Sequence, residues 1–158
     1  MLVTHRHNLS EDVRHRTPEE HRTGDSAYRS WVRRQLKGRK FVGLVASVEG
    51  RTAGSGCIWL REVHPRPGAT VGVVPYVMAV YTMPEYRELG VASRIVREAM
   101  NWSREKGYPV MTLHASKMGR SIYQKLGWKR SWEMRVDLTD LRPAVKIQSR
   151  NKLKDFTI

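Results

Sequence analysis

The sequence has one cysteine, few acidic residues and no long apolar run, and these shortages exclude several classes of protein. Cys57 stands alone, which excludes an internal disulfide, and it lies in strand-like sequence where a small buried residue is expected. No apolar run approaches the roughly 20 residues that cross a membrane, and the first residues lack the apolar core of a signal peptide. A cytoplasmic protein is therefore expected. The six histidines are scattered and indicate no metal-ligand set.

The chain's 158 residues, of which 40% are hydrophobic, suit one domain with one core. We expect the domain to span residues 1–138 and a basic tail to follow at 139–158. Turn residues and hydrophobic periodicity predict helices at 26–37, 91–106 and 119–126, and strands at 41–48, 52–60, 75–82 and 109–114. Residues 8–25 are expected to be a loop that ends at Asp25 as an N-cap, 61–74 a long loop, and 128–138 one or two final strands. This order predicts a mixed α/β sheet.

The most informative stretch joins a predicted strand to a predicted helix through Arg87-x-x-Gly90-x-Ala92. The first N–H groups of a helix have no partner within the helix, and the helix dipole favours an anion there. Gly90 allows close approach of the backbone. The turn is therefore a candidate phosphate site.

A second motif follows about thirty residues later, Tyr123-x-x-Leu126-Gly127-Trp128. Together the two motifs resemble the GNAT superfamily of N-acetyltransferases, with Trp128 in place of the usual Phe. The resemblance covers roughly residues 40 to 138. It implies the GNAT fold, acetyl-CoA as cosubstrate and an amine as acceptor. The family usually opens with a strand before its first helix; here that strand is either absent or reduced to residues 1–5.

The resemblance also implies which residues hold acetyl-CoA. The strands at 76–82 and 109–114 would splay apart, the backbone of the first would hold the pantetheine, and the turn would hold the pyrophosphate. Ser116 stands where many members carry a coenzyme-binding Asn, although a capping role explains it equally well. The expected cofactor-binding residues are Val80, Tyr81, Thr82, Arg87, Glu88, Leu89, Gly90, Val91, Ala92, Ser93, Ser116 and Tyr123.

Catalysis requires a proton for the leaving thiolate and loss of a proton from the amine. Tyr123 is the candidate general acid, because a phenol with a pKa near 10 stays protonated at neutral pH. Glu133, Glu62 and His114 are the candidate bases. Each of the three also has an ordinary structural explanation, and direct attack with proton loss through water stays open.

The 29 basic and 15 acidic residues give a net charge of +14. One concentration, Lys117, Arg120, Lys125, Lys129, Arg130 and Arg135, flanks the expected groove for coenzyme A, itself a polyanion. Attraction of the coenzyme is the preferred explanation, and nucleic-acid binding the less favoured one. The alternative function is a catalytically inactive CoA sensor or basic nucleic-acid adaptor. A homodimer is expected, because Tyr28, Trp31, Val32 and Leu36 form an apolar stripe and the missing strand leaves a sheet edge open.

Overall fold

The computed structural model describes residues 1–13, 16–65, 67 and 72–134. Residues 1–128 form one compact unit, and the chain from Lys129 onward forms a second. The sequence analysis placed the end of the domain at residue 138 instead. Residues 129–134 contain no strand, and the rest of the predicted final strands and the tail at 139–158 lie outside the described residues. No helix of the described part is long and apolar enough to span a membrane.

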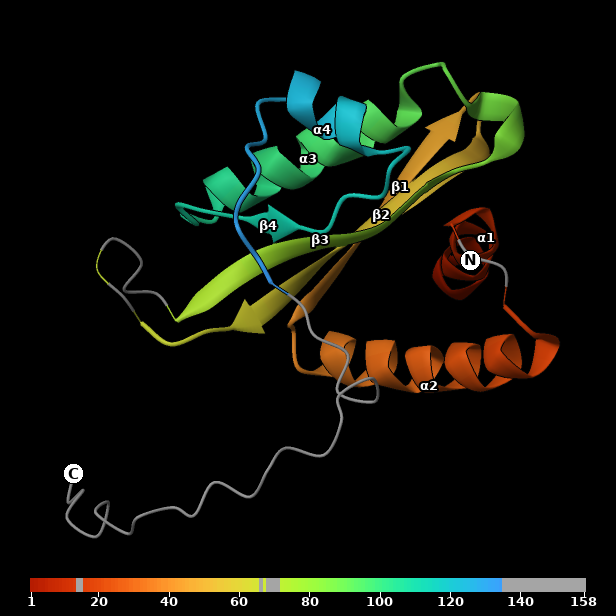
Figure 1. The fold of residues 1–158 in the computed structure, drawn as a ribbon, viewed down its shortest axis with the longest axis horizontal. Coiled ribbons are helices and arrows are strands. Elements are labelled where there is room, and N and C mark those ends of the chain that lie inside the picture. The colour runs from red at the N-terminus through yellow and green to blue at the C-terminus, as the bar shows by residue number, and fades with distance from the viewer. Residues whose placement is uncertain (14–15, 66, 68–71, 135–158) are drawn as a thin grey trace, which may run out of the picture. The chain divides into compact units, whose positions relative to one another are not determined.

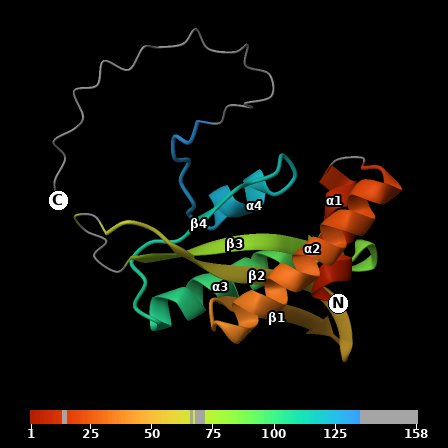
Figure 2. The same cartoon turned by 90° about the horizontal axis from the view of Figure 1, so that it is seen from below.

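The first unit is a mixed α/β sheet covered by helices on both faces. Its elements in chain order are α1 (Leu2–Val13), α2 (Pro18–Lys37), β1 (Phe41–Val48), β2 (Arg51–Glu62), β3 (Val73–Thr82), the 3-10 turn η1 (Pro84–Tyr86), α3 (Val91–Glu105), β4 (Thr112–Leu113) and α4 (Arg120–Lys125). The strand order is β1-β2-β3-β4, with only β4 parallel to its neighbour. Helices α1 and α2 lie on one face and α3 and α4 on the other, as Figure 1 and Figure 2 show.

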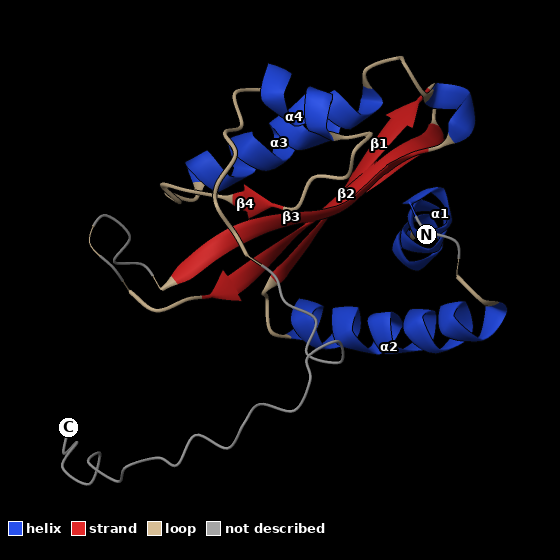
Figure 3. Ribbon diagram, viewed as in Figure 1, coloured by secondary structure: helices blue, strands red, loops and turns tan. Residues whose placement is uncertain are grey.

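The N-terminal region corrects the sequence analysis in two places (Figure 3). The first residues form helix α1, so they are not a reduced opening strand. Helix α2 begins at Pro18 and not after Asp25, because Thr17 and Glu20 form a capping box: the Thr17 hydroxyl accepts from Glu20 N–H, and the Glu20 carboxylate accepts from Thr17 N–H. Asp25 lies inside the helix and pairs instead with Arg6 and His7 of α1.

The apolar stripe on α2 is largely covered by its own sheet. Tyr28 and Val32 are buried against Phe41 and Cys57, whereas Leu36 remains 49% exposed. Burial raises the pKa of the Cys57 thiol to about 11, so the interpretation of this residue as a buried structural cysteine is confirmed. The stripe therefore no longer argues for a dimer. Strand β1 remains the open edge of the sheet.

Helix α3 packs unusually close to β2 because glycines face it. A Cβ added at Gly56 would lie 2.6 Å from Ile95 Cγ2, and one added at Gly54 would lie 2.6 Å from the Tyr81 carbonyl oxygen. Ile95 and Val96 of α3 are buried in this contact layer. The close packing fixes the N-terminal end of α3 beside the last residues of β3, where the site lies.

Candidate functional site

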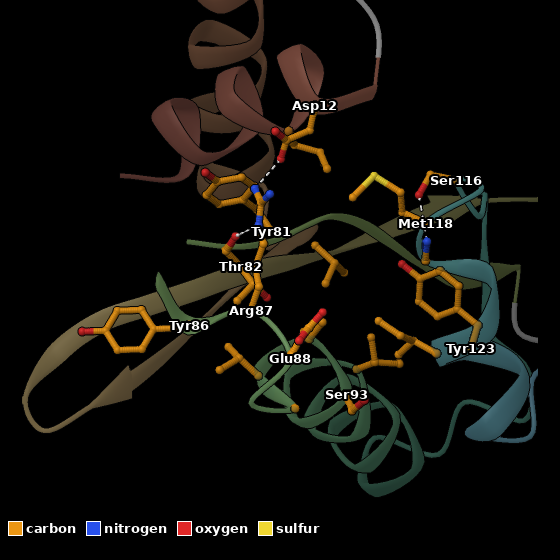
Figure 4. Close-up of a pocket in the computed structure, with 18 of the residues that line it drawn as sticks. Asp12, Tyr81, Thr82, Tyr86, Arg87, Glu88, Ser93, Ser116, Met118 and Tyr123 are labelled. Carbon is orange, nitrogen blue, oxygen red and sulfur yellow. Dashed lines mark hydrogen bonds and ion pairs between the residues drawn. The ribbon is translucent and has the colours of Figure 1, made fainter. Parts of the chain in front are cut away.

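A cavity of about 410 Å³ lies between the C-terminal end of β3, the start of α3, helix α4 and helix α1 (Figure 4). Every residue that the sequence analysis assigned to the cofactor lines it, with the exception of Leu89. Leu89 is 69% exposed and turns away from the cavity. Segments that are far apart in sequence thus converge as the two motifs predict.

The turn before α3 has the backbone of an anion site. Gly90 is the N-cap with φ +78°, and Glu88 also has a positive φ of +65°. The first α-helical hydrogen bond runs from Arg94 N–H to the Gly90 carbonyl, which leaves the earlier N–H groups of α3 without helical partners. Val91, Ala92 and Ser93 carry those groups, and all three line the cavity. The turn can therefore offer several donors and the positive end of the helix dipole to a phosphate.

Strand β3 contributes a free backbone edge. Strand β4 pairs only with Tyr76 and Val77, so among the described residues 78–82 have no partner on that side. A bulge interrupts the β2–β3 ladder where Ser55 pairs with Tyr81 and Cys57 with Met78, and Ala79 there has φ +52°. The bulge turns the backbone of residues 80–82 toward the cavity. This is the splayed arrangement that the resemblance implies.

Helix α4 places Tyr123 at the wall of the cavity. Its ring packs above Gly119, where an added Cβ would lie 2.9 Å from Tyr123 Cε2, and meets the Trp128 ring edge-on at 6.2 Å. Burial, and secondly the neighbouring Tyr76, raise the pKa of the Tyr123 phenol. The phenol is thus protonated at neutral pH and able to donate. Ser116 also lines the cavity, and its hydroxyl accepts from Gly119 N–H at 3.1 Å, so the cofactor and capping interpretations both stand.

Helix α1 supplies a wall that the sequence analysis missed. Leu9, Asp12 and Val13 line the cavity, and Asp12 Oδ2 accepts from Arg87 Nη2 at 2.7 Å. Nothing in the local sequence marks Asp12, because its role arises from a contact 75 residues away along the chain. The aliphatic Ile122, Met118 and the cation Lys125 on the opposite wall were also not predicted.

The three candidate bases do not gather at the cavity. Glu62 lies opposite Val73 at the other end of the β2–β3 ladder, where its salt bridge to Lys40 lowers the pKa of its carboxyl. His114 follows β4, and its Nδ1 lies 2.6 Å from the Tyr76 hydroxyl. Glu133 belongs to the second unit of the chain. None of the three lines the described cavity.

Solved structures share this fold. A GCN5-related N-acetyltransferase from Ralstonia eutropha JMP134 superposes with a TM-score of 0.79 at 22% identity, covering 87% of this chain and 90% of that chain. A predicted acetyltransferase with acetyl-CoA from Clostridium acetobutylicum gives a TM-score of 0.80 at 22% identity, covering 90% and 91%.

Sequence comparison points the same way. Human N-acetyltransferase 8B is 27% identical over 103 residues, which covers 52% of this chain and 45% of that protein, so the chain spans less than half the length of this curated relative. The family model described as the acetyltransferase (GNAT) domain matches residues 7–131, most of the chain. The chain therefore belongs to the GNAT acetyltransferase family.

Proposed function

We propose that this protein is an N-acetyltransferase that passes the acetyl group of acetyl-CoA to a primary amine by direct attack in a ternary complex. The observation that carries the proposal is the cavity, which brings the free edge of β3, the N-terminus of α3 and Tyr123 together. Membership of the GNAT family and the fold shared with a structure that contains acetyl-CoA support the same cosubstrate.

Acetyl-CoA binding is assigned to backbone groups more than to side chains. The N–H groups at the start of α3 accept the pyrophosphate as hydrogen-bond donors, with Lys125 and Arg87 as nearby cations. The unpaired edge of residues 80–82 suits the amide groups of the pantetheine, which can continue the sheet as a β4-like partner. One backbone N–H at this edge would also polarise the acetyl carbonyl.

Acetyl transfer forms one bond and breaks one. The neutral amine attacks the thioester carbon, the carbon–sulfur bond breaks, and the sulfur leaves as a thiolate. Tyr123 gives its proton to the thiolate, and the proton that the amine loses returns through a base or water to solvent. A lysine-like amine has a pKa near 10.4, so deprotonation must accompany binding or attack.

The base remains the open part of the proposal. Glu62 is the weakest of the candidates, since it is ion-paired to Lys40 at the far end of the sheet. His114 has the right intrinsic pKa and adjoins Tyr76, a neighbour of Tyr123. Glu133 and a water path stay in the proposal beside it.

Calorimetric titration with acetyl-CoA, followed by thiol release on a panel of amines, tests the function. The panel should contain small amines, aminoglycosides, peptides with free N-termini and lysine peptides. Binding with turnover on one class supports the proposal and identifies the acceptor. Binding without thiol release on any amine favours the inactive CoA sensor, and absence of binding refutes both.

Dimerisation through the open edge strand β1 also stays a proposal. Light scattering at about 0.15 M salt, where surface charges are screened over about 8 Å, should give a dimer mass. A monomer mass across a tenfold range of concentration contradicts it.

A further inference from the structure

Two histidines and a glutamate meet where α1 crosses α2, on the face of the sheet opposite α3. They are His7 and Glu11 of α1 and His21 of α2, and one ligand atom from each lies within 4.8 Å of the others. His7 and Glu11 are four residues apart, so they share one face of α1. His21 comes from the next helix, and its ring centroid is 4.2 Å from that of His7.

The buried member of this cluster lacks a hydrogen bond. The His21 side chain is only 9% exposed, and its Nε2 has no hydrogen-bond partner of acceptable geometry. The Glu11 carboxylate is in ion-pair contact with that nitrogen but does not satisfy it as a hydrogen bond. A buried polar atom left in this way costs free energy, which a bound cation would recover.

A carboxylate behind His7 completes the arrangement. Asp25 Oδ2 lies 2.7 Å from His7 Nδ1, so Asp25 accepts from that nitrogen and orients the ring with Nε2 available on the other side. Carboxylates that bind the second nitrogen of a metal-ligating histidine are the usual support of such ligands. Arg6 also reaches Asp25, at 3.3 Å, but its guanidinium lies over the Tyr28 ring, 4.7 Å from the centroid.

We infer that His7, Glu11 and His21 form a binding site for a divalent transition metal, with Zn²⁺ the best match. Two imidazoles and one carboxylate are a known zinc ligand set that leaves one position for water. Mg²⁺ and Ca²⁺ prefer sites made entirely of oxygen ligands. The sequence analysis found no metal-ligand set because its pattern spans two helices; only the spacing of His7 and Glu11 was visible.

The ion would clamp α1 onto α2. Helix α1 also carries Leu9, Asp12 and Val13, which line the cavity described above. A metal held by His7 and Glu11 on the same turns would therefore fix one wall of that cavity. The clamp does not depend on the proposed acetyltransferase activity, and the metal alone is enough to test it.

Titration of the full chain without a polyhistidine tag with ZnCl₂ tests the site. We expect one Zn²⁺ per chain and a rise in melting temperature of roughly 5–10 °C at a Zn²⁺ concentration about 100 times Kd, with no rise in Mg²⁺. Co²⁺ should bind with the visible absorption bands of a low-symmetry, four-coordinate site.

Three variants separate this site from chance binding. Glu11→Gln and His21→Gln should each weaken Zn²⁺ binding at least tenfold and remove the rise in melting temperature. His64→Gln removes an exposed histidine outside the cluster and should change neither. If His21→Gln fails to fold, Glu11→Gln decides, because Glu11 is 43% exposed and its loss leaves no cavity. Zn²⁺ binding that is absent in the parent, or equal in the parent and Glu11→Gln, overturns the inference.

Discussion

Asp12 of α1 holds Arg87 of the phosphate turn, with Asp12 Oδ2 2.7 Å from Arg87 Nη2 across the mouth of the cavity. Arg87 Nε also donates to the Thr82 carbonyl at 3.4 Å. A carboxylate thus stands beside the place proposed for a pyrophosphate. The pair links the N-terminal helix to the turn that both motifs surround.

Asp12→Asn should tighten the binding of acetyl-CoA, with Kd falling roughly three- to tenfold. Removal of the carboxylate ends its repulsion of the polyanion and frees Arg87 to approach the phosphates; partly exposed charges at this distance interact by about 1 kcal/mol. Calorimetry at about 0.05 and 0.5 M salt should show the gain shrinking with salt. Asn8→Asp, on α1 but outside the cavity lining, is the control for an added or removed charge. A weaker Kd for Asp12→Asn would mean that the pair positions Arg87 for the phosphate.

The sequence predicted the centre of the fold and of the site better than its borders. Strand β1 and helix α3 were placed within a residue, because their hydrophobic periodicity and flanking glycines are local signals. The start of α2 was missed because Gly24 and Asp25 look like a helix boundary, whereas the capping box at Thr17 and Glu20 decides it. The bulge at Ala79 and the Asp12–Arg87 pair depend on tertiary contacts, which no local pattern encodes.

Gly90→Asp should abolish detectable binding of acetyl-CoA. Gly90 has φ +78°, which disfavours any side chain, and the new carboxylate would stand at the start of α3, where the phosphate is proposed to bind. Gly50→Asp is a matched control, because Gly50 has φ +76° in the β1–β2 turn and, like Gly90, has no atom within 4 Å of an added Cβ. Both variants should lose similar stability, but only Gly90→Asp should lose binding. Equal affinity in the two folded variants would move the phosphate site elsewhere.

Gly56→Ala should destabilise the protein by about 1–3 kcal/mol, the usual range for forcing an extra carbon into a packed core. The added Cβ would lie 2.6 Å from Ile95 Cγ2, so α3 or β2 must shift. Gly24→Ala is the contrasting variant: its Cβ meets only Arg6 Nη1 at 3.7 Å within α2, and it should stabilise by about 0.5–1 kcal/mol. Urea unfolding followed by circular dichroism gives both values. A neutral Gly56→Ala would show that the glycine does not set the separation of α3 from the sheet.

Tyr123→Phe should lower kcat about 100-fold and leave the Kd for acetyl-CoA within twofold, because the hydroxyl acts on the leaving thiolate and the ring is kept. Tyr108→Phe, a tyrosine that stacks on Trp102 and does not line the cavity, should leave both constants unchanged.

The same assignment has a pH signature. Burial raises the pKa of Tyr123 above its ordinary value near 10, so the acid form persists through the neutral and mildly alkaline range. The kcat of the parent should therefore not fall between about pH 7 and 9 through loss of this proton, and any rise there reports deprotonation of the amine or its base. Steady-state kinetics over this range, on the acceptor found by the amine panel, provide the measurement. A kcat that declines along a single ionisation in this window in the parent and is flat in Tyr123→Phe would mean that Tyr123 titrates there, contrary to its buried position.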